Sequence, residues 1–269
     1  MTSILHAVVL GSRDYKDHDR MYTLYSRERG RVDVLGKGTR KFASKLAAHM
    51  TPYTELTCMI AHGRIWDKLA GVERGHDFRG IRERMDLLTL GSSVNELLTT
   101  GVGRGEPDST LYDFALDVYA WIEGLQDVSS SRLFFIHSAL TLKWLVMLGV
   151  GPHVDACVHC REELEHIERP LLSVSQGGLI CRACKDEDRA RFADAEDVTR
   201  ELLSALRFIA LAPLHVLLTR SFEPLMVDLA RIHEAFVAYH LERDLKVARF
   251  LSSLYPARAI FSHAPVALV

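Results

Sequence analysis

The stretch GRVDVLG at residues 30–36 alternates polar and apolar side chains with a period of two between two glycines. This pattern is typical of a β-strand with one buried face, and the glycines favour a turn at each end. Further short strands are predicted at residues 4–10, 21–25, 53–60 and 65–72, with a helical segment at 42–50 and a hairpin turn at 61–64. Five short strands with a helical segment after the third favour a small barrel of the OB type, although the pattern also permits an SH3-like barrel.

From about residue 80 the apolar residues recur three and four positions apart, as on the buried face of a helix. Helices are predicted at residues 81–99, 111–125, 132–148 and 199–212, and from 225 towards 251. Asp108 and Ser109 are suited to cap the second helix, and Pro213 to end the fourth. We therefore expect an α+β fold with an OB-fold domain at residues 1–80 and an α-helical domain at 81–269, the segment after Pro256 being irregular.

Four of the five cysteines form two Cys-x2-Cys pairs, Cys157 with Cys160 and Cys181 with Cys184, separated by twenty residues. Two such pairs can place four sulfur atoms around one tetrahedral ion, and thiolate sulfur suits Zn(II). Disulfides or free thiols are the alternative, but disulfides are disfavoured in a cytosolic chain. Because four thiolates close the coordination shell, we expect one structural Zn(II) ion in an insertion at about residues 154–188. His159 is a less favoured ligand, and Cys58 is expected to be a core residue.

The chain of 269 residues is 48% hydrophobic and 25% charged, which excludes a disordered or collagen-like protein. Its longest apolar run, residues 144–151, is much shorter than the ~20 residues that cross a bilayer. The first residues lack the basic start and apolar region of a signal peptide. We therefore expect a cytoplasmic protein with no membrane partner.

The net charge of −2 conceals an uneven distribution. Residues 1–80 carry 14 Lys and Arg against 9 Asp and Glu, whereas the remainder carries 19 against 26. The densest basic part is residues 36–41, where Lys37, Arg40 and Lys41 can neutralise phosphates and two glycines are expected to expose backbone N–H groups. A solvated barrel rim is the alternative. The pattern departs from a phosphate-binding P-loop at both Arg31 and Gly38, so ATP binding is not expected.

Aromatic residues lie among these cations and can stack on bases, as in OB-fold proteins that bind single strands, or can belong to the core. They are Tyr15, Tyr22, Tyr25 and Phe42. The many histidines and carboxylates lie in no catalytic motif, so no catalytic residue is assigned.

The order of these elements resembles the RecO family of bacterial DNA repair and recombination mediators. The opening strand at residues 8–20 with its Arg-Asp-Tyr and Asp-Arg motifs, the Glu-x-Gly turn at 28–30 and the Lys-Gly-x-Arg loop at 37–40 are similar to that family. Residues 148–152 and 173–178 before the two cysteine pairs, and 239–251 near the end, match it as well.

The resemblance implies a non-enzymatic protein of the RecF pathway that binds single- and double-stranded DNA and anneals complementary strands. It implies that the protein helps to load RecA on DNA coated with single-strand-binding protein (SSB), with RecR and the C-terminal tail of SSB as partners, the tail lying on the helical domain. The DNA contacts implied at matching basic positions are Arg13, Arg20, Lys37, Arg40 and Lys41, and then Arg29, Arg31 and Lys45.

Two other functions remain as alternatives to a recombination mediator. An RNA-binding OB-fold protein fits the barrel and the basic loop, and would prefer RNA to DNA at matched salt. A zinc-dependent hydrolase or nuclease needs an open coordination position, which four thiolates do not offer.

Overall fold

The computed structural model describes residues 1–42, 44, 46–220 and 222–254. The predictions for Lys45 and for the segment after Pro256 therefore lie outside the described residues. The chain divides into two compact units, residues 1–127 and 128–269. The units are groups of residues that pack together, and they do not show which part of the chain folds on its own. The predicted domain boundary at residue 80 therefore stays a prediction.

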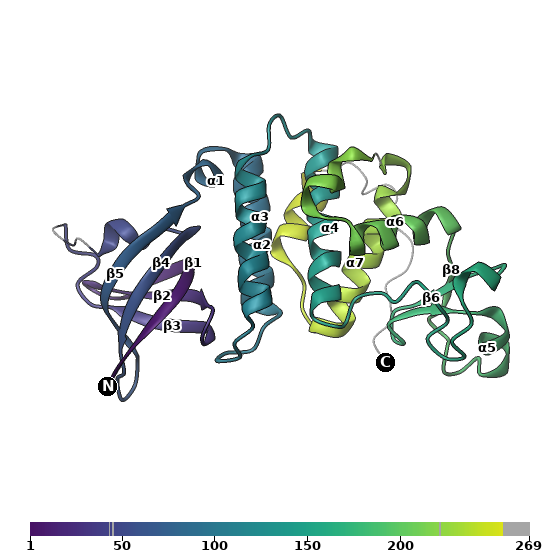
Figure 1. The fold of residues 1–269 in the computed structure, drawn as a ribbon, viewed down its shortest axis with the longest axis horizontal. Coiled ribbons are helices and arrows are strands. Elements are labelled where there is room, and N and C mark those ends of the chain that lie inside the picture. Colours follow the sequence, from purple (N-terminus) through teal and green to yellow (C-terminus); the bar gives the residue numbers. More distant parts are fainter. Residues whose placement is uncertain (43, 45, 221, 255–269) are drawn as a thin grey trace. The chain divides into compact units, whose positions relative to one another are not determined.

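The first unit begins with five strands, which form a closed barrel. They are β1 (Thr2–Lys16), β2 (Asp19–Ser26), β3 (Gly30–Gly36), β4 (Thr54–Ala61) and β5 (Lys68–Asp77). Hydrogen-bonded neighbours follow the order β1-β2-β3-β5-β4, and β4 pairs with β1 to close the ring (Figure 1). Only the β3–β5 pair runs parallel among these strands, where Leu35 lies beside Lys68. The ring is OB-like and precedes a helical region, so the predicted α+β fold class is confirmed.

Alternate side chains of the strands fill the barrel interior, as a period of two requires. The interior cluster consists of Leu5, Ala7, Val9, Tyr22, Leu24, Val32, Val34, Met50, Leu56, Cys58, Ile60 and Leu69. Cys58 is thus a core residue as predicted, and burial raises the pKa of its thiol to about 12. Tyr22 and Tyr25 are both buried, so the hypothesis that they stack on bases is wrong.

The second strand pair differs from the prediction in its position. The link between β4 and β5 is the six-residue loop 62–67 and not a turn at 61–64, and Ile65 is 80% exposed. The backbone N–H of Leu35 donates to the carbonyl of Asp67 at 2.8 Å, which fixes the start of β5 beside β3. The predicted helical segment at 42–50 is reduced to a 3₁₀ turn, η1 (Ala47–His49).

Three helices complete the first unit: α1 (Arg79–Glu83), α2 (Met85–Thr100) and α3 (Ser109–Glu123). The single helix predicted at 81–99 is interrupted at Arg84, whose backbone is extended with φ −130° and ψ 134°. The Arg84 guanidinium bonds Asp86 and the carbonyl of Leu125, which holds this break in place. Asp108 caps α3 as predicted, because its carboxylate accepts from the N–H groups of Thr110 and Leu111.

The second unit is organised around α4 (Ser130–Met147), which is buried from Leu133 to Leu145. It packs against α6 (Arg200–Leu211) and α7 (Met226–Leu241) (Figure 1). The helix predicted to continue towards 251 is interrupted at Glu242, which takes a left-handed φ of 51°. The chain then resumes as α8 (Lys246–Leu254).

Short elements between α4 and α6 make up the cysteine-bearing segment of the second unit. They are η2 (Leu164–His166), β6 (Leu171–Ser173), β7 (Gly178–Ile180), α5 (Arg182–Glu187) and β8 (Glu196–Asp197). Two further 3₁₀ turns, η3 (Leu214–Thr219) and η4 (Glu223–Leu225), lie between α6 and α7. The sheet order is β7-β6-β8. Among the residues that the structure describes, no helix combines the length and the apolar character that a membrane span needs.

Candidate metal centre and nucleic-acid interface

The four cysteines of the two pairs meet at one point in the second unit. Their Sγ atoms all lie within 4.8 Å of one another. The Sγ–Sγ distance is 4.0 Å between Cys157 and Cys184 and 3.6 Å between Cys160 and Cys181. These distances exceed the ~2.05 Å of a disulfide, but they match the ~3.8 Å between sulfurs that bind one tetrahedral ion through bonds of ~2.3 Å. The predicted clustering is therefore confirmed, and the cysteines are a plausible site for a single metal ion.

The local backbone positions these sulfurs and perturbs their ionisation. The N–H of Cys181 donates to the Sγ of Cys157 at 3.4 Å. Burial opposes ionisation of Cys157, but backbone N–H groups that include those of Cys160 and Cys181 outweigh it and lower its pKa to about 7. Burial raises the pKa of Cys181 to about 11 and also raises that of Cys184. Cys181 and Cys184 would therefore need a cation that displaces their protons to become thiolates at neutral pH.

The donor set also indicates what such an ion does. Four sulfur ligands fill a tetrahedral shell and leave no position for an activated water, which is the arrangement of structural sites. His159 is exposed, and its ring lies 5.4 Å from that of Phe192, outside the sulfur cluster.

Four of the predicted DNA-binding residues come together at one end of the barrel. The loop after β3 folds onto the β1–β2 turn, because the N–H of Arg40 donates to the carbonyl of His18 at 3.0 Å. Arg20 and Arg40 both reach the carboxylate of Asp14, at 3.0 and 3.4 Å. Lys37 and Lys41, in the same loop, are exposed. We call Arg20, Lys37, Arg40 and Lys41 the basic cluster.

The glycines of this loop do not present N–H groups to a ligand as expected. The N–H of Gly38 donates to Asp19 Oδ1 at 2.8 Å. Gly36 is paired with Arg20 in the β2–β3 ladder and is buried. The expectation of free backbone donors is therefore wrong, and the loop offers side-chain cations instead.

The other predicted DNA-binding residues lie elsewhere. Arg13 is exposed, but the register sets it opposite Met21 and sets Asp14 opposite Arg20, so Arg13 and Arg20 occupy opposite faces of the hairpin. Arg29 lies in the β2–β3 turn and its Nη1 donates to Asp67 at 2.8 Å. Arg31 is half-buried, and its carbonyl accepts from the N–H of Gly105 at 3.2 Å. The structure therefore does not bring these three residues into the basic cluster.

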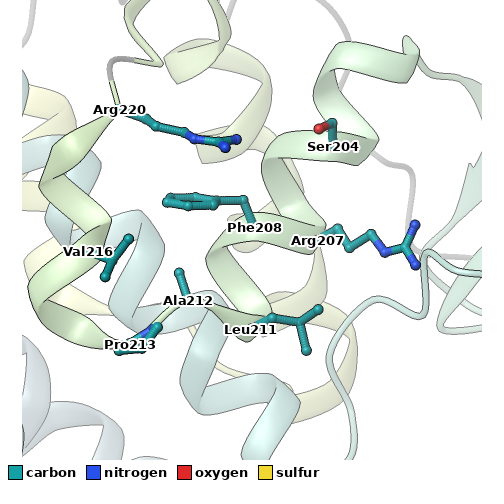
Figure 2. Close-up of a pocket in the computed structure, with 8 residues that line it drawn as sticks. All are labelled: Ser204, Arg207, Phe208, Leu211, Ala212, Pro213, Val216 and Arg220. Carbon is teal, nitrogen blue, oxygen red and sulfur yellow. The ribbon is translucent and has the colours of Figure 1, made fainter.

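Sequence reasoning missed a pocket between α6 and η3 in the second unit (Figure 2). The cavity measures about 410 Å³, and it is lined by Ser204, Arg207, Phe208, Leu211, Ala212, Pro213, Val216 and Arg220. Figure 2 shows the Arg220 guanidinium over the ring of Phe208, and the distance to the ring centroid is 4.6 Å. Arg207 bonds Asp155 at 2.7 Å through its Nε. The lining combines apolar side chains with two arginines. In the sequence, only Pro213 marked this place.

Comparisons with known proteins agree with this architecture. The family model described as "Recombination protein O N terminal" matches residues 1–75, and "Recombination protein O C terminal" matches residues 82–249. The chain is 32% identical over 255 residues to the DNA repair protein RecO of Pelotomaculum thermopropionicum, with 94% of each chain covered. It is 29% identical over 251 residues to the DNA repair protein RecO of Desulforamulus reducens, with 93% of this chain and 94% of the relative covered. This chain belongs to the RecO family of DNA repair and recombination proteins.

Proposed function

We propose that this chain is a non-enzymatic recombination mediator that binds single- and double-stranded DNA and anneals complementary strands. With RecR, it helps to load RecA on single strands coated with SSB. The observation that carries the proposal is the basic cluster at one end of the barrel, where loops of OB folds bind oligonucleotides. Cations there gain affinity by releasing counterions from the phosphate backbone. We expect the protein to act in the bacterial cytoplasm, at the nucleoid.

The ion held by Cys157, Cys160, Cys181 and Cys184 is proposed to be one Zn(II). Sulfur donors in a tetrahedral set suit this metal. When bound, it supplies folding free energy to the cysteine-bearing segment around β6 and β7, because it joins the two cysteine pairs. It takes no part in a chemical step.

The pocket between α6 and η3 is proposed to bind the C-terminal tail of SSB. Phe208, Leu211 and Val216 offer an apolar surface to a hydrophobic side chain. Arg207 and Arg220 offer positive charge to acidic residues and to a terminal carboxylate. The tail would thereby bring the protein to DNA that SSB already covers.

The test is a titration of the full-length protein with a fluorescent DNA single strand, bare and then coated with SSB, at two salt concentrations. Salt-dependent binding to both forms and annealing of complementary strands without nucleotide support the proposal. The same titration with RNA of equal sequence separates the RNA-binding alternative, which predicts tighter binding to RNA at matched salt. Failure to bind DNA at low salt would overturn the proposal.

A further inference from the structure

Two aromatic side chains, one from a strand end and one from a loop, meet beside the basic cluster. Tyr15 lies near the end of β1 and is 39% exposed, and Trp66 lies in the loop 62–67 and is half-buried. The Nε1–H of Trp66 donates to Tyr15 Oη at 3.1 Å. The ring centroids are 6.3 Å apart with an interplanar angle of 79°. In this edge-on arrangement, at most one ring face is covered by the other ring.

The loop that carries Trp66 is held in place before any ligand binds. Asp67 accepts from the N–H of Gly63 at 3.4 Å and from Arg29 at 2.8 Å, and it contacts His62 Nδ1 at 3.2 Å. Burial opposes ionisation of Asp67, but these hydrogen bonds outweigh it and lower the pKa of its carboxyl group. A Cβ on Gly63 would lie 2.1 Å from the carbonyl of Trp66, so the turn requires glycine. Such preorganisation reduces the ordering entropy that binding costs.

Basic side chains lie near this aromatic pair. The Nζ of Lys16 lies 5.6 Å from the centroid of the Tyr15 ring. Arg40 of the basic cluster donates to the carbonyl of Lys16 at 3.3 Å, and Arg64 is exposed next to Ile65 in the Trp66 loop. Phosphates bound by these cations would carry their bases past the two rings.

We propose that Tyr15 and Trp66 form a stacking site for an unpaired base of a DNA single strand. This inference rests on the proposed function and adds a preference to it. Every base has a face that stacks on an aromatic ring, so the site accepts any sequence. Bases inside a duplex are already stacked on one another, so the pair contributes affinity to single strands and not to duplex DNA.

The test compares two strands with equal numbers of phosphates, an oligothymidine and a matched abasic strand, on the full-length protein at one salt concentration. The wild type is expected to bind the oligothymidine about ten- to a hundred-fold more tightly, the range for one stacked base. The double variant Tyr15→Ala, Trp66→Ala loses this difference and keeps its affinity for the abasic strand and for duplex. Tyr15→Phe and Trp66→Phe keep their rings and therefore most of the difference.

Two controls make the result specific. Tyr239→Ala removes a 55%-exposed ring from α7 and is expected to leave both affinities unchanged. The chain has three tryptophans, of which Trp144 is 1% exposed. Quenching of tryptophan emission by oligothymidine is expected in the wild type and is lost in Trp66→Phe. Equal affinity of the wild type for both strands would overturn the stacking site while leaving DNA binding intact, whereas binding to neither strand would overturn the proposed function itself.

Discussion

Asn95 on α2 donates a hydrogen bond from its Nδ2 to the carbonyl oxygen of Leu10 on β1, over 2.7 Å. The Oδ1 of the same amide accepts from the hydroxyl of Tyr119 on α3. Asn95 is buried and Tyr119 is fully buried, so water cannot replace either bond. One side chain therefore connects a barrel strand with both long helices of the first unit.

Replacing Asn95 with Ala is expected to destabilise the protein by about 1–3 kcal/mol, because a carbonyl and a hydroxyl lose their partner in a buried place. Denaturant unfolding followed by circular dichroism measures the change. Asp117→Ala on the exposed side of α3 is the control and should change stability by less than ~0.5 kcal/mol. Equal effects of the two substitutions would show that the amide does not connect the barrel to the helices.

Replacing Lys37, Arg40 and Lys41 together with Ala is expected to weaken DNA binding and to reduce the slope of log affinity against log salt by up to ~2–3. Each lost phosphate contact removes roughly 0.7–0.9 from that slope. The ion pair with Asp14 leaves Arg40 able to bind a phosphate, because ion pairs between exposed side chains contribute only ~0–1 kcal/mol. Fluorescence anisotropy at four or more salt concentrations gives the slope, with Arg249→Ala on α8 as the control. An unchanged slope in the triple variant would exclude the basic cluster from the interface.

Replacing Cys157 or Cys181 with Ser is expected to remove the metal and to unfold the small sheet of the second unit. Zinc analysis of the reduced protein should fall from one ion per chain to nearly none, and hydrogen exchange should rise over residues 154–188. DNA affinity should change by less than about twofold, because the four cysteines lie in the second unit and the basic cluster lies in the barrel of the first. Cys58→Ala is the matched control, since this fifth cysteine is buried in the barrel and should leave zinc content unchanged. A wild type that contains no zinc would contradict the assignment.

Replacing Arg220 or Phe208 with Ala is expected to weaken binding of an SSB-tail peptide more than tenfold, the effect typical of an Arg or aromatic hot spot. Isothermal titration calorimetry measures the affinity. Amidation of the peptide's terminal carboxylate should weaken binding to the wild type more than binding to Arg220→Ala, because the variant already lacks the guanidinium that pairs with this carboxylate. Affinity for bare DNA should stay the same in both variants. If the tail peptide binds both variants as tightly as it binds the wild type, then the tail does not bind in this pocket.

The sequence predicted the parts of the fold that depend on local pattern. The alternation at residues 30–36 and the cysteine spacing required no tertiary information, and both were confirmed. The breaks at Arg84 and Glu242 could not be predicted, because neither position carries Gly or Pro. The bonds from Arg84 that hold the first break include one to the carbonyl of Leu125, 41 residues away.

The candidate DNA interface was predictable only in part, for the same reason. The count of basic residues located the region, but it could not show that Arg29 bonds Asp67, which lies 38 residues later. Trp66 and Ile65 resemble strand residues, so the sequence placed them in a strand; they lie instead in the loop that ends where Leu35 pairs with Asp67. Long-range pairing decides which apolar and basic side chains face solvent.

The protein is expected to lose stability in weak acid, because it buries two histidines, His233 on α7 and His137 on α4. Their rings meet edge-on at 5.3 Å, and both side chains are buried. Burial lowers the pKa of His233 to about 4, and burial together with His233 lowers that of His137.

The pKa of an unfolded histidine is ~6.5, so the unfolded chain binds more protons than the folded protein between about pH 4 and 6.5. The contribution of His233 to stability is therefore present above pH ~6.5 and is lost as the pH drops below it, by up to about 1.4 kcal/mol per pH unit. His137 changes stability in the same direction. His233→Leu should flatten this dependence by about that slope in urea unfolding from pH 5 to 7, whereas His166→Gln at an exposed site should not. An equal slope in the wild type and His233→Leu would mean that His233 is not neutral in the folded protein.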